Sequence, residues 1–433
     1  MDYREALQWI HSRERFGIKP GLDRIRYILG ELSDPHRVLK VIHIGGTNGK
    51  GSTAAFAASV LREAGFKTGL YTSPYLESFT NRMAVDGRDV TPDTLTDLVE
   101  QVKPVVDGIS QQDDLGSPTE FEVVTALALL YFARAGVDYL VLEVGLGGRL
   151  DATNVVEKPL VSVITNVSLE HADILGDTVA KIAAEKAGII KEGSPVLTAS
   201  NDPEVLEVVR RAAAAKRSPL YRVGMDFTFV PGAKSLQGQY FAYRGRELSL
   251  DDLFIPLLGE HQVQNAVTAL AALELAGLRI PEDTLRRGFK ATSWPGRLEI
   301  LRENPLVVID AAHNPGSMAS LSRALEDYFP RGNRVLVLGI LGDKSIPEML
   351  KNIVPVADKF VVTRALHFTR AAEPEAVAAE VRRLTSKPVE AVPDLGEALR
   401  RGRELAEGGT LCVTGSFYTI SEARRLIVED RVI

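Results

Sequence analysis

A glycine-rich segment between an apolar run and an alanine-rich run most strongly limits how this chain of 433 residues can fold. The apolar run 38–44 predicts a buried strand, and the run 54–64 predicts a helix. Between them lies Gly45-Gly46-Thr47-Asn48-Gly49-Lys50-Gly51-Ser52-Thr53. Strand, glycine loop and helix in this order are typical of a phosphate-binding loop. The glycines let backbone N–H groups surround an anion, and the helix N-terminus adds partial positive charge.

Lys50 supplies a full positive charge to this loop, and Ser52 or Thr53 supplies a hydroxyl for Mg²⁺. The spacing differs from the commonest form, G-x-x-x-x-G-K-[ST], which would need a glycine in place of Ile44 and a hydroxyl in place of Gly51. The alternative is a glycine turn that binds nothing, and it leaves the lysine and both hydroxyls unexplained. The residues predicted to bind a nucleoside triphosphate are Thr47, Asn48, Gly49, Lys50, Gly51, Ser52 and Thr53.

The composition indicates an ordinary globular protein that is too long for one core, so two domains are expected. The formal net charge is -6, and lysine and arginine are dispersed along the chain. This argues against nucleic acid as a partner and favours a small anionic ligand. Cys412 is the only cysteine, which excludes an intrachain disulfide, and no apolar run is long enough to span a membrane. We therefore expect a cytoplasmic protein without a membrane partner.

Alternating strand and helix patterns predict an α/β fold with a mostly parallel sheet. Short alternating runs within 225–256 predict a small antiparallel subsheet, and Pro295-Gly296 punctuates the chain before a second series of strands. We predict a P-loop-type ATP-binding domain over 1–295 and a smaller Rossmann-like domain over 296–433. The other strands are expected at 67–71, 138–144, 160–165, 306–309, 334–339, 359–363 and 410–413, and helices at 119–135, 178–190 and 262–276.

Four further residues stand at or near predicted strand ends. Glu143 lies in an apolar strand, where a carboxylate is costly unless it is paired or binds a metal. Because ligands of open α/β sheets bind at the carboxyl ends of strands, Glu143 is a candidate Mg²⁺ ligand; the alternative is a buried pair with an arginine. His171 follows the strand 160–165, and Asp310 with His313 follows 306–309, where a carboxylate suits ribose hydroxyls. Lys186 lies in a predicted helix, and the pattern alone does not select it.

Taken together, these segments resemble the folylpolyglutamate synthase and dihydrofolate synthase family of the Mur-ligase superfamily. The resemblance covers nearly the whole chain, and G-K-G-S at Gly49–Ser52 is this family's form of the loop. Its markers are Gly46–Ser52, Thr72-Ser73-Pro74, Glu143–Asn154, His171 with Leu175-Gly176, Glu185–Ile189, Gln264-Asn265, Pro295-Gly296-Arg297 and Asp310–Pro315.

The resemblance implies ATP-dependent amide ligation. A carboxylate of the pterin substrate attacks the γ-phosphate of ATP, and the amino group of L-glutamate attacks the resulting acyl phosphate. Because carboxylate and triphosphate are both anionic, the site needs compensating positive charge. The implied catalytic residues are Lys50, His171 and Lys186. Ser52 and Glu143 would hold one Mg²⁺, and His171 with Glu143 a second, although Mg²⁺ prefers oxygen ligands.

Further roles follow from the same resemblance. Lys186 would carry a carbamate formed with CO₂. Asn265 would contact adenine, Arg297 a phosphate, and Asp310 with His313 the ribose and the nucleotide. The implied substrate-binding residues are Ser73, Pro74, Arg82, Asp151 and Ala152, with the last two at a pterin pocket.

The resemblance leaves two kinds of enzyme possible, which differ in the pterin substrates that they accept. Arg149–Asn154 resembles the bifunctional enzymes, whereas Tyr75 stands where many relatives that make dihydrofolate carry histidine. We expect a monomer that adds glutamate both to dihydropteroate and to reduced folate. The alternatives are a folylpolyglutamate synthase alone, a Mur-type cell-wall ligase, a P-loop NTPase without ligation, and a nucleotide-binding regulatory module. Only 43 residues precede Ile44, which argues against the cell-wall ligase.

Overall fold

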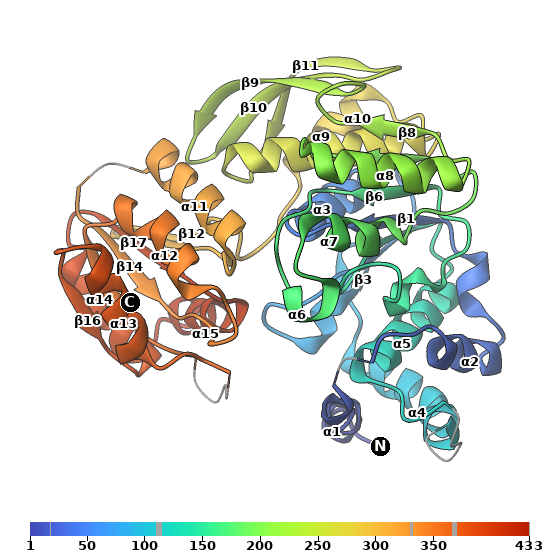
Figure 1. Ribbon diagram of the computed structural model, residues 1–433, viewed down its shortest axis with the longest axis horizontal. Coiled ribbons are helices and arrows are strands. Elements are labelled where there is room, and N and C mark those ends of the chain that lie inside the picture. Colours follow the sequence, from blue (N-terminus) through green and yellow to red (C-terminus); the bar gives the residue numbers. More distant parts are fainter. Residues whose placement is uncertain (18, 110–114, 330–331, 366–369, 433) are drawn as a thin grey trace. The chain divides into compact units, whose positions relative to one another are not determined.

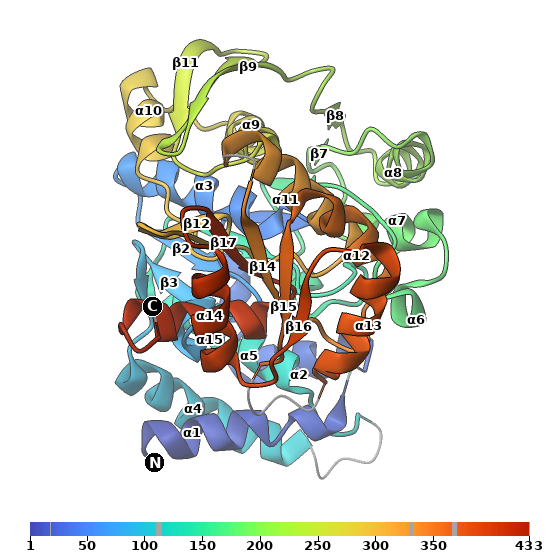
Figure 2. The ribbon, with the colours of Figure 1, turned by 90° about the vertical axis from the view of Figure 1, so that its left-hand side faces the viewer.

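The computed structural model describes residues 1–17, 19–109, 115–329, 332–365 and 370–432. It forms two compact units (Figures 1 and 2). The first unit comprises 1–231, 241–254 and 264–292, and the second comprises 232–240, 255–263 and 293–433. The continuous part of the second unit begins at Ser293, three residues before the predicted boundary at 296, which stays a prediction.

The first unit is built on an eight-stranded sheet of order β4-β3-β2-β5-β1-β6-β7-β8. Its strands are β1 (Val41–Gly45), β2 (Thr68–Tyr71), β3 (Met83–Val85), β4 (Arg88–Asp89), β5 (Tyr139–Glu143), β6 (Val161–Ile164), β7 (Val196–Thr198) and β8 (Leu220–Arg222). The pairs from β2 to β8 are parallel, and β3 and β4 add an antiparallel edge. β1 lies centrally between β5 and β6, so the loop that follows it opens at the middle of the sheet.

Helices and short 3₁₀ turns surround this sheet. α1, α2, α4 and α5 pack together, and their apolar residues contribute to one hydrophobic core cluster (Figure 1). α3 packs against α10, and α7 against α8. The helices are α1 (Tyr3–His11), α2 (Asp23–Glu31), α3 (Lys50–Glu63), α4 (Pro92–Ile109), α5 (Glu120–Ala135), α6 (Ala172–Leu175), α7 (Val179–Ala187), α8 (Pro203–Ala215), α9 (Glu260–Leu275) and α10 (Glu282–Lys290). The 3₁₀ turns are η1 (Glu14–Phe16), η2 (Pro35–Val38), η3 (Phe79–Arg82) and η4 (Ala152–Val155).

A separate three-stranded sheet confirms the predicted antiparallel subsheet. It has the order β11-β10-β9, with β9 (Thr228–Ser235), β10 (Gly238–Arg244) and β11 (Ser249–Ile255). The side chains of β10 alternate between buried and exposed along most of the strand, as expected for a sheet with one covered face.

The second unit has its own six-stranded sheet of order β12-β13-β17-β14-β15-β16, parallel except for β12. In Figure 2, α11 to α13 lie on one side of this sheet and α14 with α15 on the other, which confirms the predicted second α/β layer structure. The strands are β12 (Glu299–Glu303), β13 (Leu306–Ile309), β14 (Arg334–Leu338), β15 (Lys359–Val362), β16 (Val389–Ala391) and β17 (Thr410–Thr414). The helices are α11 (Pro315–Tyr328), α12 (Ile346–Ile353), η5 (Val354–Val356), α13 (Pro374–Leu384), α14 (Leu395–Leu405) and α15 (Phe417–Val428).

Two local differences from the sequence-based expectation have physical reasons. The helix after the glycine loop begins at Lys50 instead of residue 54, because Gly49 caps it in a left-handed conformation and the lysine and hydroxyl residues form its first turn. The segment 72–90, for which no strand or helix was predicted, contains η3, β3 and β4, since β3 pairs with the edge of β2. None of the described helices combines the length and hydropathy that a membrane span requires.

Candidate functional site

The glycine loop between β1 and α3 has a backbone that only glycine fits at two positions. Gly46 has φ +139° and Gly49 has φ +86°. A Cβ added at Gly46 would lie 1.9 Å from the Thr165 Oγ1 atom, and one added at Gly49 would lie 2.4 Å from the Asn265 Oδ1 atom. The loop is therefore closely packed against the residues after β6 and against α9.

Side chains and backbone after β6 hold this loop in place. The Thr47 N–H donates to the Asn166 carbonyl at 2.8 Å, and the Asn48 N–H donates to the Asn166 side-chain oxygen at 2.8 Å. The Thr165 hydroxyl donates to the Asn48 carbonyl at 2.7 Å. The Lys50 ammonium bridges the loop by donating to the carbonyls of Gly46 and Thr47, each at 3.1 Å. The loop thus has a fixed conformation with a cation at its centre.

Replacing Gly46 with alanine is expected to weaken nucleotide binding about tenfold or more, because the new methyl group would displace Thr165 and with it the Asn48 carbonyl. Titration with a fluorescent ATP analogue measures this. Gly65→Ala is the matched control: Gly65 also has a positive φ, +82°, but nothing lies within 4 Å of its Cβ position. G65A should therefore retain full nucleotide affinity. Equal affinities for G46A and the wild type would contradict this role of the loop.

Glu143 stands at the end of β5, next to the loop. In the parallel register it lies opposite Ile44 of β1, and its side chain is 4% exposed. The Ser73 N–H donates to its Oε2 atom at 3.2 Å. Ser52, in the first turn of α3, is also buried. A buried carboxylate at the end of β5 and a buried hydroxyl in the helix that follows β1 are oxygen donors of the kind that Mg²⁺ takes.

Lys186 on α7 is buried against the same loop, which its sequence pattern did not reveal. Its ammonium donates to the Gly46 carbonyl at 2.9 Å, so Lys50 and Lys186 share one acceptor. Burial, and next the nearby Lys50 charge, lower the pKa of Lys186 to about 7. A lysine in this state is partly neutral at physiological pH and can act as a nucleophile.

His171 lies in the segment between β6 and α6. Its φ of +52° is unusual for a residue other than glycine, and its carbonyl accepts from the N–H groups of Ile174 and Leu175. The His171 Nε2 atom is 3.9 Å from the Glu170 Oε1 atom. Among the described residues, neither Glu143 nor His171 belongs to a group of three His, Cys, Asp or Glu side chains close enough to share an ion.

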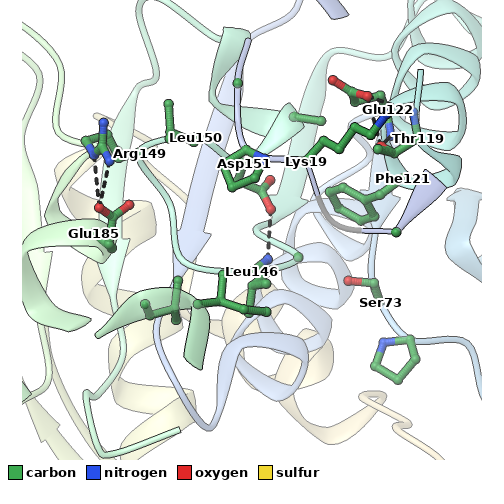
Figure 3. A pocket seen from close by; sticks show the side chains of 18 of the residues that line it. Lys19, Ser73, Thr119, Phe121, Glu122, Leu146, Arg149, Leu150, Asp151 and Glu185 are labelled. Atoms are coloured by element: carbon green, nitrogen blue, oxygen red, sulfur yellow. Dashed lines mark hydrogen bonds and ion pairs between the residues drawn. The ribbon is translucent and has the colours of Figure 1, made fainter. Parts of the chain in front are cut away.

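A cavity of about 430 Å³ in the first unit contains all five predicted substrate-binding residues (Figure 3). Its wall includes Ser73 and Pro74 from the segment after β2, Arg82 from η3, and Asp151 with Ala152 at the start of η4. The Asp151 Oδ2 atom accepts from the Leu146 N–H at 2.8 Å. Arg82 lies over the rings of Tyr75 and Phe79, at 5.1 and 5.6 Å from their centres. The structure thus brings together residues that are up to 79 positions apart, from Ser73 to Ala152.

Other residues of the cavity wall were missed by the sequence analysis. The Arg24 Nε atom lies 3.0 Å from both carboxylate oxygens of Glu122, and its guanidinium also donates to the Lys19 carbonyl at 2.6 Å. Arg149 pairs with Glu185 at 2.9 Å (Figure 3). In the sequence, the capping pattern Thr-x-x-Glu and the turn residues around Lys19 could have indicated a helix start and a loop at these positions. The missed polar and aromatic wall residues are Lys19, Thr119, Phe121 and Glu122, whereas Arg149 and Glu185 were named only as markers of the family.

Three predicted nucleotide contacts lie in the second unit. Asp310 follows β13, is buried, and accepts from the N–H groups of Leu298 and Ala312, each at 2.9 Å. Burial raises its pKa, while Arg297 and these two N–H groups lower it. The His313 Nδ1 atom lies 2.8 Å from the Ala311 carbonyl oxygen. The Arg297 guanidinium lies 4.7 Å from the ring centre of Phe417, and the His313 ring 5.5 Å from it. Asn265, in contrast, belongs to the first unit and stands against Gly49.

Two protein-family models match the chain. The model described as Mur ligase middle domain matches residues 44–273, and the model described as Mur ligase, glutamate ligase domain, matches residues 296–417. The chain is 38% identical over 437 residues to the dihydrofolate synthase/folylpolyglutamate synthase of Bacillus subtilis, with 98% of both chains covered.

Solved structures agree with these matches. The chain resembles Mycobacterium tuberculosis folylpolyglutamate synthase complexed with ADP and AMPPCP, with a TM-score of 0.92, 35% identity, and 98% of this chain and 99% of that chain covered. It also resembles Escherichia coli FolC in complex with DHPP and ADP, with a TM-score of 0.89, 30% identity, and 100% of this chain and 99% of that chain covered.

Proposed function

Because the chain belongs to the dihydrofolate synthase/folylpolyglutamate synthase family of Mur-type ligases, we propose that it joins L-glutamate to both dihydropteroate and reduced folate. The chain is an ATP-dependent amino-acid ligase, and the expected cell-wall ligase and non-ligase NTPase alternatives are not favoured. Within this family one alternative remains, a folylpolyglutamate synthase that does not accept dihydropteroate.

One observation carries this proposal: a hydrogen bond connects the end of β5, beside the glycine loop, to the wall of the cavity. Glu143 stands beside the loop and accepts from the N–H of Ser73, which lines the cavity. A pterin held in the cavity could therefore extend its carboxylate toward the γ-phosphate. Nucleotides in the two related structures support ATP as the phosphate donor.

In this proposal the residues at the loop have separate tasks. Lys50 neutralises the triphosphate, and its fixed position lowers the barrier to attack by a second anion. The buried oxygens of Ser52 and Glu143 fit Mg²⁺, which would supply further positive charge at the phosphates. His171 is proposed for a second Mg²⁺ site, together with Glu143.

Lys186 fits the carbamate that the family resemblance implies. Its buried amine has a pKa of about 7, so a substantial fraction is neutral and can add CO₂. A C–N bond forms and one proton is released to water, which leaves an anion with two oxygens that suits a cation site better than an ammonium group does. In the second unit, Asp310 has lone pairs left beyond its two backbone donors and is proposed to accept from ribose hydroxyls. Asn265 is proposed to contact adenine, Arg297 a phosphate, and His313 the nucleotide.

The oligomeric state and the compartment are part of the proposal. We place the protein in the cytoplasm as a monomer, since the cavity and the phosphate loop are formed by one chain. The single cysteine, Cys412, is buried, and a reducing compartment suits it. Size-exclusion chromatography with light scattering measures the molar mass in solution and so tests whether the protein is a monomer.

The purified protein with ATP, Mg²⁺ and L-glutamate is expected to release phosphate when either dihydropteroate or tetrahydrofolate is added. Mass spectrometry should show a product heavier by one or more glutamyl residues in each reaction. Omitting glutamate is the control. Phosphate release that does not depend on a pterin would contradict the ligase proposal, and turnover of tetrahydrofolate alone would leave a folylpolyglutamate synthase.

A further inference from the structure

A buried chain of hydrogen bonds connects the cavity to the centre of the first sheet. Asp151 lines the cavity, and the Thr153 hydroxyl donates to its Oδ1 atom at 2.6 Å. The Thr153 oxygen in turn lies 2.9 Å from the Nε2 atom of His43. His43 belongs to β1, between Leu142 of β5 and Ser162 of β6 in register. His43 and Thr153 are fully buried, and Asp151 is nearly so.

The proton positions along this chain follow from counting donors. The Asp151 carboxylate accepts from the N–H groups of Leu146 and Thr153 in addition to the Thr153 hydroxyl. Burial raises the pKa of the Asp151 carboxyl, and these donors oppose that rise because they favour the ionised acid, whose oxygens only accept. Thr153 therefore gives its single proton to Asp151, and His43 must donate from Nε2 to the Thr153 oxygen. The His43 Nδ1 atom then carries a lone pair, and no partner for it is found in the described structure.

The charge state of His43 is also fixed by its surroundings. Burial, and next the positive charge of Lys191, lower the pKa of His43 to about 3. Lys191 donates to the Asn154 carbonyl, directly after Thr153. The imidazole is therefore neutral at physiological pH and acts as a hydrogen-bond donor of fixed direction. A residue needed only for packing would not leave a buried ring nitrogen without a partner.

We propose that His43 and Thr153 are positioning residues that hold the Asp151 carboxylate ionised and aimed into the cavity, where it accepts N–H groups of the pterin ring. This inference rests on the proposed function, because it takes a pterin as the occupant of the cavity. Three donors hold the carboxylate, and its remaining lone pairs would accept N–H groups at the edge of a heterocycle bound in the cavity. His43 does not touch the substrate; its effect passes through Thr153.

Matched substitutions separate this positioning role from a general packing role. Thr153→Val removes the hydroxyl at nearly constant volume, and Thr153→Ser keeps it. His43→Asn places its amide where Nδ1 stands, whereas His43→Gln restores an N–H near the Nε2 position. T153V and H43N are expected to raise KM for dihydropteroate about tenfold, with KM for ATP unchanged. For T153S and H43Q, KM for dihydropteroate should stay within about threefold of the wild-type value.

The pH profile supplies a second readout. Burial raises the pKa of the Asp151 carboxyl, and the bond from the Thr153 hydroxyl partly offsets this rise, so losing the hydroxyl raises the pKa further. The acid limb of kcat/KM for the pterin should therefore move to higher pH in T153V, by roughly one unit, and stay in place in T153S. Nitrogen-15 NMR of the wild type should show His43 protonated at Nε2 and not at Nδ1.

The outcomes distinguish this inference from the proposed function. If the wild type turns over pterins while T153V keeps the wild-type KM and pH profile, the positioning role is overturned. A parallel rise in KM for ATP would instead show general damage to the fold and would also overturn it. A wild type without pterin-dependent turnover would overturn the proposed function and, with it, the assignment of the pterin. NMR signals of an Nδ1-protonated His43 would contradict the proton order itself.

Discussion

Replacement of Lys50 with alanine is expected to lower pterin-dependent phosphate release by about 10³-fold or more. The Lys50 ammonium is the cation that the loop holds between the Gly46 and Thr47 carbonyls, so the attacking carboxylate would meet an uncompensated triphosphate without it. The fold should survive, because the side chain is only half-buried and its hydrogen bonds among the described residues go to two carbonyls of the loop itself. Stopped-flow phosphate detection at saturating ATP measures the rate, and circular dichroism checks the fold.

Lys290→Ala is the control for the loss of one lysine charge. Lys290 is exposed at the end of α10, and its replacement should leave the rate unchanged. Because both variants lose one positive charge, a difference between them reports the position of Lys50 and not the net charge. Wild-type turnover by K50A would contradict the assignment of the glycine loop to phosphate binding.

Replacement of Lys186 with methionine is expected to lower turnover by about 10²–10³-fold and at the same time to stabilise the protein near pH 7. Its side chain is buried against Gly46, and its pKa falls from 10.5 to about 7 on folding. Between these two values the unfolded chain binds more protons than the folded chain. The stability contributed by this site therefore rises as pH increases from about 7 to 10.5, and the charged form opposes folding at lower pH.

A thermal melt series from pH 6 to 9 is the measurement for this prediction. K186M should melt roughly 2–4 °C above the wild type at the acid end of the series, with a gap that closes toward alkaline pH. The wild-type turnover should increase as pH rises through about 7 and should fall when CO₂ is removed from the buffer. A wild type that is indifferent to CO₂ would contradict the carbamate, and full turnover by K186M would contradict any catalytic role.

The phosphate loop and the five predicted cavity residues could be placed from sequence for two different reasons. The loop is local: an apolar strand, glycines and an alanine-rich helix specify its conformation within a short stretch. The cavity residues are separated along the chain, and only the resemblance to a family connected Ser73 and Arg82 with Asp151 before the structure did.

What the sequence could not supply depends on contacts between distant elements. The low pKa of Lys186 arises from burial and from Lys50, neither of which leaves a trace in its helical pattern. His43 likewise appears as one more residue of a buried strand until its ring is seen beside Thr153. Arg24, in the same way, is one of many arginines until Glu122 and the Lys19 carbonyl are placed around it.

Lys50 and Lys186 both donate to the Gly46 carbonyl, so their two amines lie close together. This closeness has a consequence for the order in which CO₂ and ATP can bind. If the triphosphate binds at Lys50 as proposed, its negative charge will raise the proton affinity of the Lys186 amine and make it less able to add CO₂. The amine is therefore most reactive before ATP is loaded. We expect enzyme exposed to CO₂ first and ATP second to start without a lag, and the reverse order to give a slow onset.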